Sequence, residues 1–333
     1  MSRQPATRYL GIDVGGTNIK VGLTDDQGQV LASTKVDTDI EESLEAGLKN
    51  MTQAVKDVLS QINISINDVT AIGLACPGPM DIKAGRLLQL ANLPTWRNVD
   101  IRDIVAERLG RPVILQNDAN AAAYGEYWAG AAQNAEIMAL ITLGTGIGSG
   151  VVIKGEILEG AHSHAAEYGF MIIQTDNGRE HPGGGYHGVL ESYASSRALI
   201  LRAVHRLQSG DPSSLSQLLG KKDELTPLAI MQHAEAGDVL AHELIMEVAR
   251  YIGVGIVSMM HTMNPEVILL GGAMTFGQLA TRTGRDFLAG IKKEVKDRAF
   301  AIPAARTRID YAQLGGSAGF IGAAGWAAKS FRA

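Results

Sequence analysis

The sequence predicts an α/β protein made of two similar α/β lobes with a cleft between them. Its 333 residues exceed the roughly 100 to 200 residues of a common domain, so two cores are expected. A unit of strand, glycine turn and strand occurs twice, around Ile12–Thr17 and around Ile141–Gly146. The two copies lie about a domain length apart, which indicates a duplicated lobe whose glycine turns face each other across an interlobe binding site.

The first copy begins with a hairpin. An apolar run at 9–14 predicts a buried strand, Gly15-Gly16 interrupts it, and a second strand follows at 19–23. The turn at 25–28 then leads to a third strand that ends at Val36. This order predicts a meander with a glycine turn at its tip.

Helices and parallel strands complete the first lobe. Apolar residues recur at spacings of three and four in 41–60, which predicts a helix that covers the sheet. A strand at 69–75 ends at the rigid turn Pro77-Gly78-Pro79. A short strand at 113–115 is followed at once by Asn117-Asp118, and a helix is expected from Ala119 to about Ala132.

The second copy repeats this order and continues with more helix. Strands are expected at 137–143 and 148–153, a long helix at 239–262, a strand at 267–270 and a final helix at 318–329. We therefore predict an N-terminal lobe of residues 1–118 and a larger C-terminal lobe of residues 119–317. The last helix, within 318–333, is expected to pack back on the first lobe.

Composition excludes several function classes. The net charge is −5, and the sequence has no Lys/Arg cluster of the kind that binds along a nucleic-acid backbone. Neither nucleic acid nor an anionic membrane is therefore an expected partner. No signal peptide is recognisable, and no apolar run approaches the roughly 18 residues of a membrane span. The single cysteine, Cys76, cannot form an intramolecular disulfide and is expected to be a packing residue. A cytoplasmic protein is predicted.

The glycine turns are candidate phosphate sites. In Asp13–Asn18 a carboxylate ends a strand, and two glycines leave backbone N–H groups open to a phosphate. The turn Gly144-Thr145-Gly146 has the same character. A single turn of this kind is also typical of a plain hairpin, whereas two of them can hold the phosphates of one nucleotide.

Asp118 lies where a strand gives way to a helix, a common place for functional side chains. One interpretation is structural, because an aspartate at a helix start can cap it by accepting N–H bonds from the first turn. The other is catalytic. A kinase needs a carboxylate within hydrogen-bond reach of the attacking hydroxyl, and Asp118 is the best-placed candidate.

These residues and their order resemble the ROK family, named for repressors, open reading frames and kinases. The matching stretches span nearly the whole chain and are Leu10–Lys20, Pro77–Pro79, Asn92–Pro94, Asn117–Ala122, Leu143–Gly148 and Asn264–Glu266 with Gly271-Gly272. The resemblance implies the two-lobed actin-like ATPase (ribonuclease H-like) fold. It also implies a glucokinase-like enzyme that uses ATP and Mg²⁺.

The resemblance implies roles for matching positions. Asp118 would be the catalytic base, and the sugar would be bound by Gly78, Asn92, Asn117, Asp118, Glu167 and Glu191. Asp13 would act near Mg²⁺, directly or through water. The nucleotide phosphates would be held by Asp13, Gly15, Gly16, Thr17, Asn18, Lys20, Gly144, Thr145 and Gly146. Gly271-Gly272 and the region of Gly315-Gly316 would flank adenosine.

The chain departs from the family at a zinc site. Similar kinases carry a His and three Cys that hold a structural zinc, and these positions are here occupied by Phe170, Pro182, Gly184 and Val189. A tetrahedral zinc site cannot form from these residues. Glu167 and Glu191 are both kept, so we expect no structural zinc and a loop held instead by packing of Phe170, Tyr186 and Val189.

Histidines in the same stretch invite a metal interpretation, but His162, His164, His181 and His187 match no usual zinc spacing. Loss of the family's histidine at Phe170 removes a polar partner of one sugar hydroxyl, which leaves the choice of sugar open.

Two functions follow from the resemblance. The first is ATP-dependent phosphorylation of a hexose hydroxyl, expected at C6, by a homodimer or higher homo-oligomer. The second is a catalytically silent sugar sensor or regulator of the same fold. Only about eight residues precede the first strand, so the DNA-binding helix-turn-helix of the family's repressors is not expected.

Overall fold

A computed structural model of the chain describes residues 7–38, 43–89, 95–221 and 223–332. The chain forms two compact units. Unit 1 is Met1–Glu136, Gly150–Ala166 and Ala312–Ala333, and unit 2 is Ile137–Ser149 and Glu167–Tyr311. Residues 119–136 are thus grouped with the first unit, whereas the lobe boundary at residue 118 stays a prediction.

The first five-stranded sheet has the order β3-β2-β1-β4-β7. Its strands are β1 (Arg8–Val14), β2 (Asn18–Asp25), β3 (Val30–Asp37), β4 (Ala71–Cys76) and β7 (Val113–Asn117). The meander β1–β3 is antiparallel, and β1, β4 and β7 are parallel. A small hairpin, β5 (Met80–Asp81) and β6 (Arg86–Leu87), follows the Pro77–Pro79 turn.

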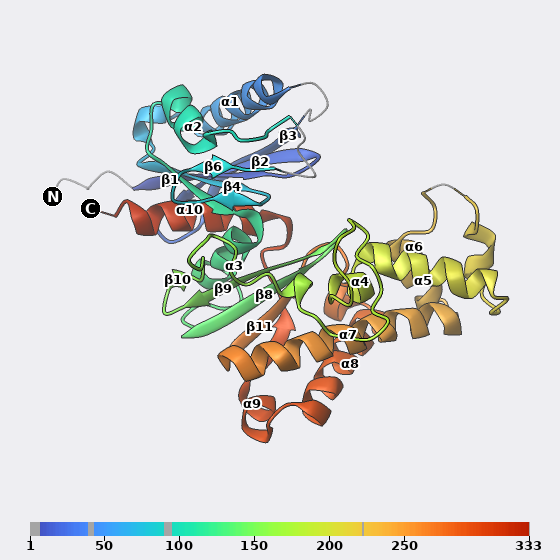
Figure 1. The fold of residues 1–333 in the computed structure, drawn as a ribbon. Helices are drawn as coiled ribbons and strands as arrows, with labels where there is room; N and C mark the ends of the chain where they lie inside the picture. The colour runs from blue at the N-terminus through green and yellow to red at the C-terminus, as the bar shows by residue number, and fades with distance from the viewer. Residues whose placement is uncertain (1–6, 39–42, 90–94, 222, 333) are drawn as a thin grey trace. The chain divides into compact units, whose positions relative to one another are not determined.

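Helices cover both faces of this sheet (Figure 1). They are α1 (Leu44–Gln61), α2 (Ile101–Leu109), α3 (Asp118–Trp128) and α10 (Ala318–Ser330). Alternate residues of β1 point to opposite faces of the sheet. Leu10 and Ile12 lie in the core on the side of α1 and α2, whereas Tyr9 packs against α10. The period of two along the strand therefore separates an apolar core from the face that carries Asp13.

Helix α10 lies unusually close to the first sheet because two strand residues have no side chain. A Cβ atom on Gly11 would overlap the carbonyl oxygen of Phe320, and one on Gly73 would overlap that of Ala323. Both strands therefore accept the backbone of α10 against their surface. Helix α10 thus contacts β1, β4 and α3 within unit 1.

The second sheet has the order β10-β9-β8-β11-β12. Its strands are β8 (Ile137–Leu143), β9 (Ile147–Ile153), β10 (Glu156–Ile157), β11 (Val267–Gly271) and β12 (Arg308–Tyr311). Strand β11 is parallel to both β8 and β12, and β10 is antiparallel to β9. The two sheets thus have the same topology, which confirms the duplication predicted from the glycine turns.

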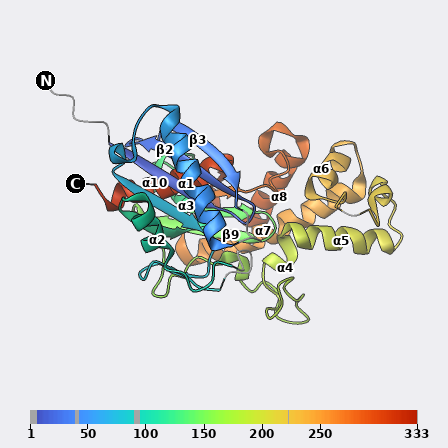
Figure 2. The same ribbon diagram turned by 90° about the horizontal axis from the view of Figure 1, so that it is seen from above.

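Unit 2 is rich in helix, as the sequence predicts. Its helices are α4 (Glu191–Ala194), α5 (Ser196–Gln208), α6 (Pro227–Glu235), α7 (Val239–Met263), α8 (Arg282–Arg298) and α9 (Ala301–Arg306). Helix α7 is central and contacts α5, α6 and α8, with α5 and α6 side by side near its N-terminal part (Figures 1 and 2).

Short 3-10 helices complete the chain: η1 (Ile66–Asp68), η2 (Tyr168–Phe170), η3 (Ser214–Leu218), η4 (Gln278–Ala280) and η5 (Gly315–Ser317).

Among the described helices, α7 has the length and mean hydropathy of a membrane-crossing helix over an 18-residue window. A search for uninterrupted apolar residues in the sequence misses it, because Glu and Arg side chains interrupt the run. In the structure 61% of that window is buried inside the protein. A core helix passes the same test, so the test alone does not indicate a membrane span.

The predicted elements are confirmed at most positions. The strand at 137–143 has the observed bounds, and the helix predicted at 239–262 differs from α7 by one residue. The strand predicted at 113–115 continues to Asn117. Asn117 is therefore the last residue of the strand, and Asp118 is the first residue of the helix. Strand β12 was not predicted, because its run of four residues carries only two apolar side chains at alternate positions.

Candidate functional site

Three parallel strands of unit 1 end side by side and bring predicted site residues of three kinds together. Asp13 of β1 lies opposite Ala75 of β4, and Cys76 of β4 lies opposite Asn117 of β7. Ligands of open α/β sheets bind outside the carboxyl ends of the strands. Asp13, Asn117 and Asp118 therefore share the edge at which a ligand is expected.

The helix cap at this edge is Asn117 and not Asp118. The Oδ1 atom of Asn117 accepts N–H groups from Ala119 at 3.0 Å and Asn120 at 3.2 Å. Asp118 is the first residue of α3 and accepts the Ala119 N–H through its own Oδ1 at 2.9 Å. The structural interpretation of Asp118 as the N-cap is thus wrong, since the neighbouring amide fills that position.

The predicted sugar residues Gly78 and Asn117 lie next to each other. A Cβ atom on Gly78 would approach the Nδ2 atom of Asn117 to 3.3 Å. The Oδ1 atom of Asn117 caps α3, so Nδ2 is the part of the side chain that faces the Pro77–Pro79 turn. The Gly78–Pro79 peptide bond is cis. Asn92, the remaining sugar residue predicted in this part of the chain, lies outside the described residues.

A buried polar network behind Asn117 was missed in the sequence. The Oε1 atom of Gln116 accepts the backbone N–H of Asn117 at 2.8 Å and the Nδ2 of Asn120 at 3.2 Å. Its Nε2 donates to Glu159 Oε1 at 2.9 Å. Gln116 is buried and directly follows the apolar residues of the same strand. A buried amide needs hydrogen-bond partners, and this polar residue after an apolar run was the signal that the sequence offered for the network. The network fixes the backbone from which Asn117 and Asp118 project.

Asp13 is placed for interaction with a cation. Burial raises the pKa of its carboxyl group, and the charge of Lys20 lowers it in part. The Nζ atom of Lys20 donates to the Gly316 carbonyl oxygen at 2.8 Å. A Cβ atom on Gly319 would lie 2.5 Å from Asp13 Oδ2, so the start of α10 packs directly against the carboxylate. A partly desolvated carboxylate of this kind favours a nearby positive charge.

Cys76 is a packing residue, as predicted. Its side chain is fully buried in the core between the first sheet and α1. Burial raises the pKa of its thiol well above the usual range, and the charges of Asp118 and Asp13 raise it further. The thiol is therefore held in its unreactive protonated form.

The first glycine turn, Gly15–Thr17, joins β1 to β2. Its carbonyl groups are used inside the protein: Gly15 accepts the hydroxyl of the buried Thr38 at 2.8 Å, and Thr17 accepts the Thr38 N–H at 3.0 Å. Within the described ranges, no acceptor bonds the N–H groups of Gly16 and Thr17. Asn18 donates its side-chain amide to Asp37 Oδ1 at 3.1 Å. The turn thus has donors to offer to an anion.

The second glycine turn, Gly144–Gly146, occupies the equivalent place between β8 and β9 in unit 2. The Gly144 carbonyl accepts the Ser196 N–H at 2.9 Å, just as the Gly15 carbonyl accepts the Thr38 hydroxyl in the first turn. Gly272 has a φ of +87°, and a Cβ there would overlap the backbone of Leu143. The predicted nucleotide residues Gly271 and Gly272 are therefore brought to the end of β8, beside Gly144.

Glu191, a predicted sugar residue, begins α4 and lies against the second glycine turn. Its Oε2 atom accepts the Ile147 N–H at 2.6 Å, and a Cβ on Gly146 would lie 2.6 Å from the same oxygen. Glu167 immediately precedes η2, in which Gly169 packs on the Ile147 carbonyl. Glu191 and the short helix after Glu167 thus both contact Ile147, the first residue of β9.

The zinc positions carry no zinc ligands, because Phe170, Pro182, Gly184 and Val189 supply neither thiolate nor imidazole. In the described part of the chain, no three His, Cys, Asp or Glu side chains form a group that could hold a metal. The rings of Phe170 and Tyr186 meet edge to face at 5.0 Å, and Val189 is 3% exposed. That this packing takes the place of a zinc stays a prediction. His181, whose Nε2 atom lies 2.6 Å from Glu191 Oε1, was not predicted to contact that glutamate.

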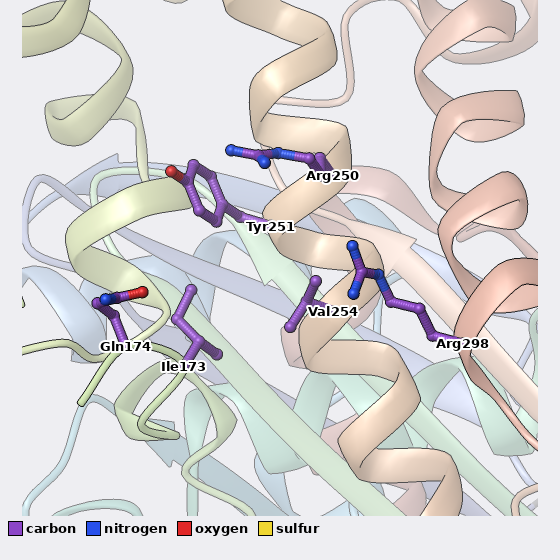
Figure 3. A pocket seen from close by; sticks show the side chains of 6 residues that line it. All are labelled: Ile173, Gln174, Arg250, Tyr251, Val254 and Arg298. Carbon is purple, nitrogen blue, oxygen red and sulfur yellow. The ribbon is translucent and has the colours of Figure 1, made fainter. Parts of the chain in front are cut away.

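One pocket of unit 2 lies apart from these residues (Figure 3). It is lined by Ile173, Gln174, Arg250, Tyr251, Val254 and Arg298. Arg250 projects from α7 and Arg298 from the end of α8. No residue predicted for sugar or nucleotide lines it, so the candidate site rests on the strand ends and turns described above.

Comparison with known proteins relates the chain to one family. The sequence model of the ROK family matches residues 9–330. A glucokinase of Halalkalibacterium halodurans is 32% identical over 323 residues, which cover 96% of this chain and 94% of that protein. A ROK family glucokinase of Streptomyces griseus, solved with glucose and AMPPNP, has a TM-score of 0.79 and 31% identity over 97% of this chain and 99% of the other.

A regulator is equally similar in structure. A ROK family transcriptional regulator, a homologue of the E. coli MLC protein, has a TM-score of 0.81 and 26% identity, with coverage of 96% of this chain and 77% of that one. The fold is accordingly the two-domain actin-like ATPase fold that the sequence predicts. The match over nearly the full length establishes that this chain belongs to the ROK family.

Proposed function

We propose that the protein is a sugar kinase that transfers the γ-phosphoryl group of ATP to a hexose hydroxyl, at C6, with Asp118 as the general base. The observation that carries this proposal is the position of Asp118 at the carboxyl ends of β1, β4 and β7, beside Asp13 and Asn117. The full-length similarity of the chain to a glucokinase that was solved with glucose and AMPPNP supports the same reaction.

The residues present fit a magnesium nucleotide. The two glycine turns offer backbone N–H groups of the kind that bind phosphates, and Asp13 offers a partly buried carboxylate oxygen near the first turn. Lys20 adds a positive charge beside Asp13. Bound ATP supplies the phosphoryl group, and Mg²⁺ neutralises charge on its phosphates.

Each residue has a defined part in the reaction. Asp118 accepts the proton of the sugar hydroxyl as the hydroxyl oxygen attacks the γ-phosphorus of ATP and ADP leaves, while its Oδ1 also accepts the Ala119 N–H. Asn117 donates its Nδ2 to a sugar hydroxyl while its Oδ1 holds the helix start. The Gln116 network keeps both side chains in register with the strand end.

The sugar is further bound by Glu167 and Glu191, together with Gly78 and Asn92. Phe170 replaces the polar residue that the family uses near one hydroxyl, so the hydrogen bonds to that hydroxyl differ from those of a glucokinase. Buried hydrogen-bonding groups dominate discrimination between similar sugars. We therefore propose a hexose or amino-sugar substrate without assigning glucose.

A coupled assay with ATP and Mg²⁺ over a panel of hexoses, amino sugars and N-acetylated sugars tests the reaction. We expect saturable ADP release with one or a few of these sugars and a product phosphate at C6, located by NMR. ADP release without sugar phosphate, or no turnover across the panel, would exclude the kinase.

The alternative is a sugar sensor that does not catalyse. It is favoured by one observation, the TM-score of 0.81 to a ROK transcriptional regulator. Calorimetric titration with the same panel separates the two functions. A sensor binds one sugar without phosphorylating it, whereas a kinase binds and phosphorylates the same sugar.

A further inference from the structure

His181 and Glu191 form a nearly enclosed pair in the loop that replaces the zinc site. The Nε2 atom of His181 lies 2.6 Å from Glu191 Oε1, and the two side chains are 11% and 15% exposed. The second ring nitrogen, Nδ1, accepts the backbone N–H of Gly183 at 2.9 Å. Both nitrogens of the imidazole are thus used within unit 2.

These contacts fix the tautomer of His181. A backbone N–H can only donate, so the Nδ1 atom that accepts it carries no proton. The proton of the neutral ring therefore lies on Nε2 and is donated to Glu191. This N–H points at the carboxylate of Glu191, so Oε1 accepts a hydrogen bond from His181. The other oxygen, Oε2, accepts the backbone N–H of Ile147.

The ring of His181 is also held on its sides. Phe170 lies 5.3 Å from it and Tyr186 lies 6.1 Å away, centroid to centroid. The backbone N–H of His181 donates to the Tyr186 carbonyl at 2.7 Å, and its carbonyl accepts the Gly184 N–H at 2.8 Å. Loop 181–186 is therefore closed on itself around the imidazole, at the positions from which the zinc ligands are missing.

We propose that His181 is a positioning residue that replaces the zinc by orienting the carboxylate of Glu191 toward the sugar. The inference rests on the proposed function, in which Glu191 binds a sugar hydroxyl. Ile147 and His181 each occupy one oxygen of the carboxylate, and the remaining lone pairs accept a hydroxyl or amide N–H of the substrate. His181 thus selects a substrate group that donates.

Variants of His181 separate the hydrogen bond from the packing. His181→Phe keeps an aromatic ring beside Phe170 and Tyr186 but removes both hydrogen bonds of the imidazole. We expect the KM for the sugar to rise about ten- to hundredfold, since hydrogen bonds to charged groups are among the strong ones, while the KM for ATP stays unchanged. His181→Gln restores an N–H donor and recovers most of the affinity. The exposed His187 of the same loop gives the matched control, and His187→Phe leaves the sugar KM unchanged.

A double variant tests whether His181 acts through Glu191. In a Glu191→Gln background, His181→Phe should raise the sugar KM by less than about twofold, because residues that share one network are not additive. Equal effects of His181→Phe with and without Glu191→Gln, or an unchanged sugar KM in His181→Phe, would overturn the proposal. Long-range ¹H–¹⁵N NMR of the imidazole gives a readout independent of activity: the Nε2–H tautomer supports the proposal and the Nδ1–H tautomer contradicts it.

Failure of the proposed function gives a different result. If the wild-type protein binds a sugar without phosphorylating it, the kinase proposal is wrong, and the same variants are compared by calorimetric Kd. A ten- to hundredfold weaker Kd in His181→Phe then still supports the positioning role. If the wild-type protein binds no sugar of the panel, both proposals fail.

Discussion

Asn117 and Asp118 divide two tasks that compete for the same carboxylate. A carboxylate that caps a helix must turn its oxygens back onto the first-turn N–H groups, and those oxygens are then poorly placed to accept a proton from a substrate. In this chain the amide oxygen of Asn117 takes the cap. The neighbouring carboxylate of Asp118, which accepts the Ala119 N–H through Oδ1, is therefore not required as the cap.

Replacement of Asp118 tests the base directly. Asp118→Asn keeps an oxygen for the Ala119 N–H but cannot accept a proton, so we expect kcat to fall by about 10² to 10⁴ while the sugar Kd changes little. Steady-state assays and calorimetry measure the two quantities. Asp26→Asn, on an exposed turn of the same unit, removes the same charge as a control. A variant that retains more than about a tenth of the wild-type rate removes Asp118 from this role.

At the scale of elements, glycine decides how closely helix and sheet can approach. Residues Gly11 and Gly73 occupy adjacent parallel strands and lie in register with each other. Both meet backbone atoms of α10. Any side chain at either position would push α10 away, and α10 carries Gly319 against Asp13. Packing of this helix therefore influences the position of a candidate site residue.

Gly73→Ala tests this packing. The new methyl group overlaps the backbone of Ala323, which cannot rotate away, so we expect a loss of roughly 1–3 kcal/mol of stability or more. The melting temperature should fall by several degrees. Gly144→Ala is the matched control for stability, because nothing lies within 4 Å of its Cβ and both changes restrict the unfolded chain equally. Equal melting temperatures for the two variants would contradict the close approach.

At the scale of the whole molecule, each unit is held by its own core without a metal cluster in the described residues. In unit 2, α7 packs with α5, α6 and α8, and its buried residues run from Leu240 to Met260. The loop that carries the zinc in similar kinases is attached by His181, Phe170 and Tyr186. Chelation should therefore leave the fold unchanged.

Metal analysis of the purified chain gives the corresponding test. We expect far less than one zinc per chain, and we expect EDTA to leave the melting temperature unchanged when no nucleotide is present, because the four ligand positions lack donor atoms. Magnesium added with ATP should still be required for turnover. A stoichiometry of about one tightly held zinc per chain would overturn the zinc-free loop.

Much of the fold could be predicted because its signals are local. Period-two and period-3.6 patterns predicted β1, β8, α7 and α10 within about two residues, and the repeated glycine turn predicted the equal topology of the two sheets. The site was predicted mainly through motif order, which named Asp13, Asn117 and Asp118. The residues that were missed, Gln116, Asn120 and His181, carry no pattern of their own and gain their meaning from distant partners.

The sequence by itself determined where the carboxylates and glycine turns of the candidate site fall, because carboxylates at strand ends and glycine-rich turns are properties of short segments. Only the tertiary structure decided which of two adjacent polar residues caps α3, since both have suitable side chains and the helix start selects one. It also decided how loop 181–186 is held. The bond between His181 and Glu191 depends on how loop 181–186 folds back on α4, and contacts of that kind are set by packing and not by spacing.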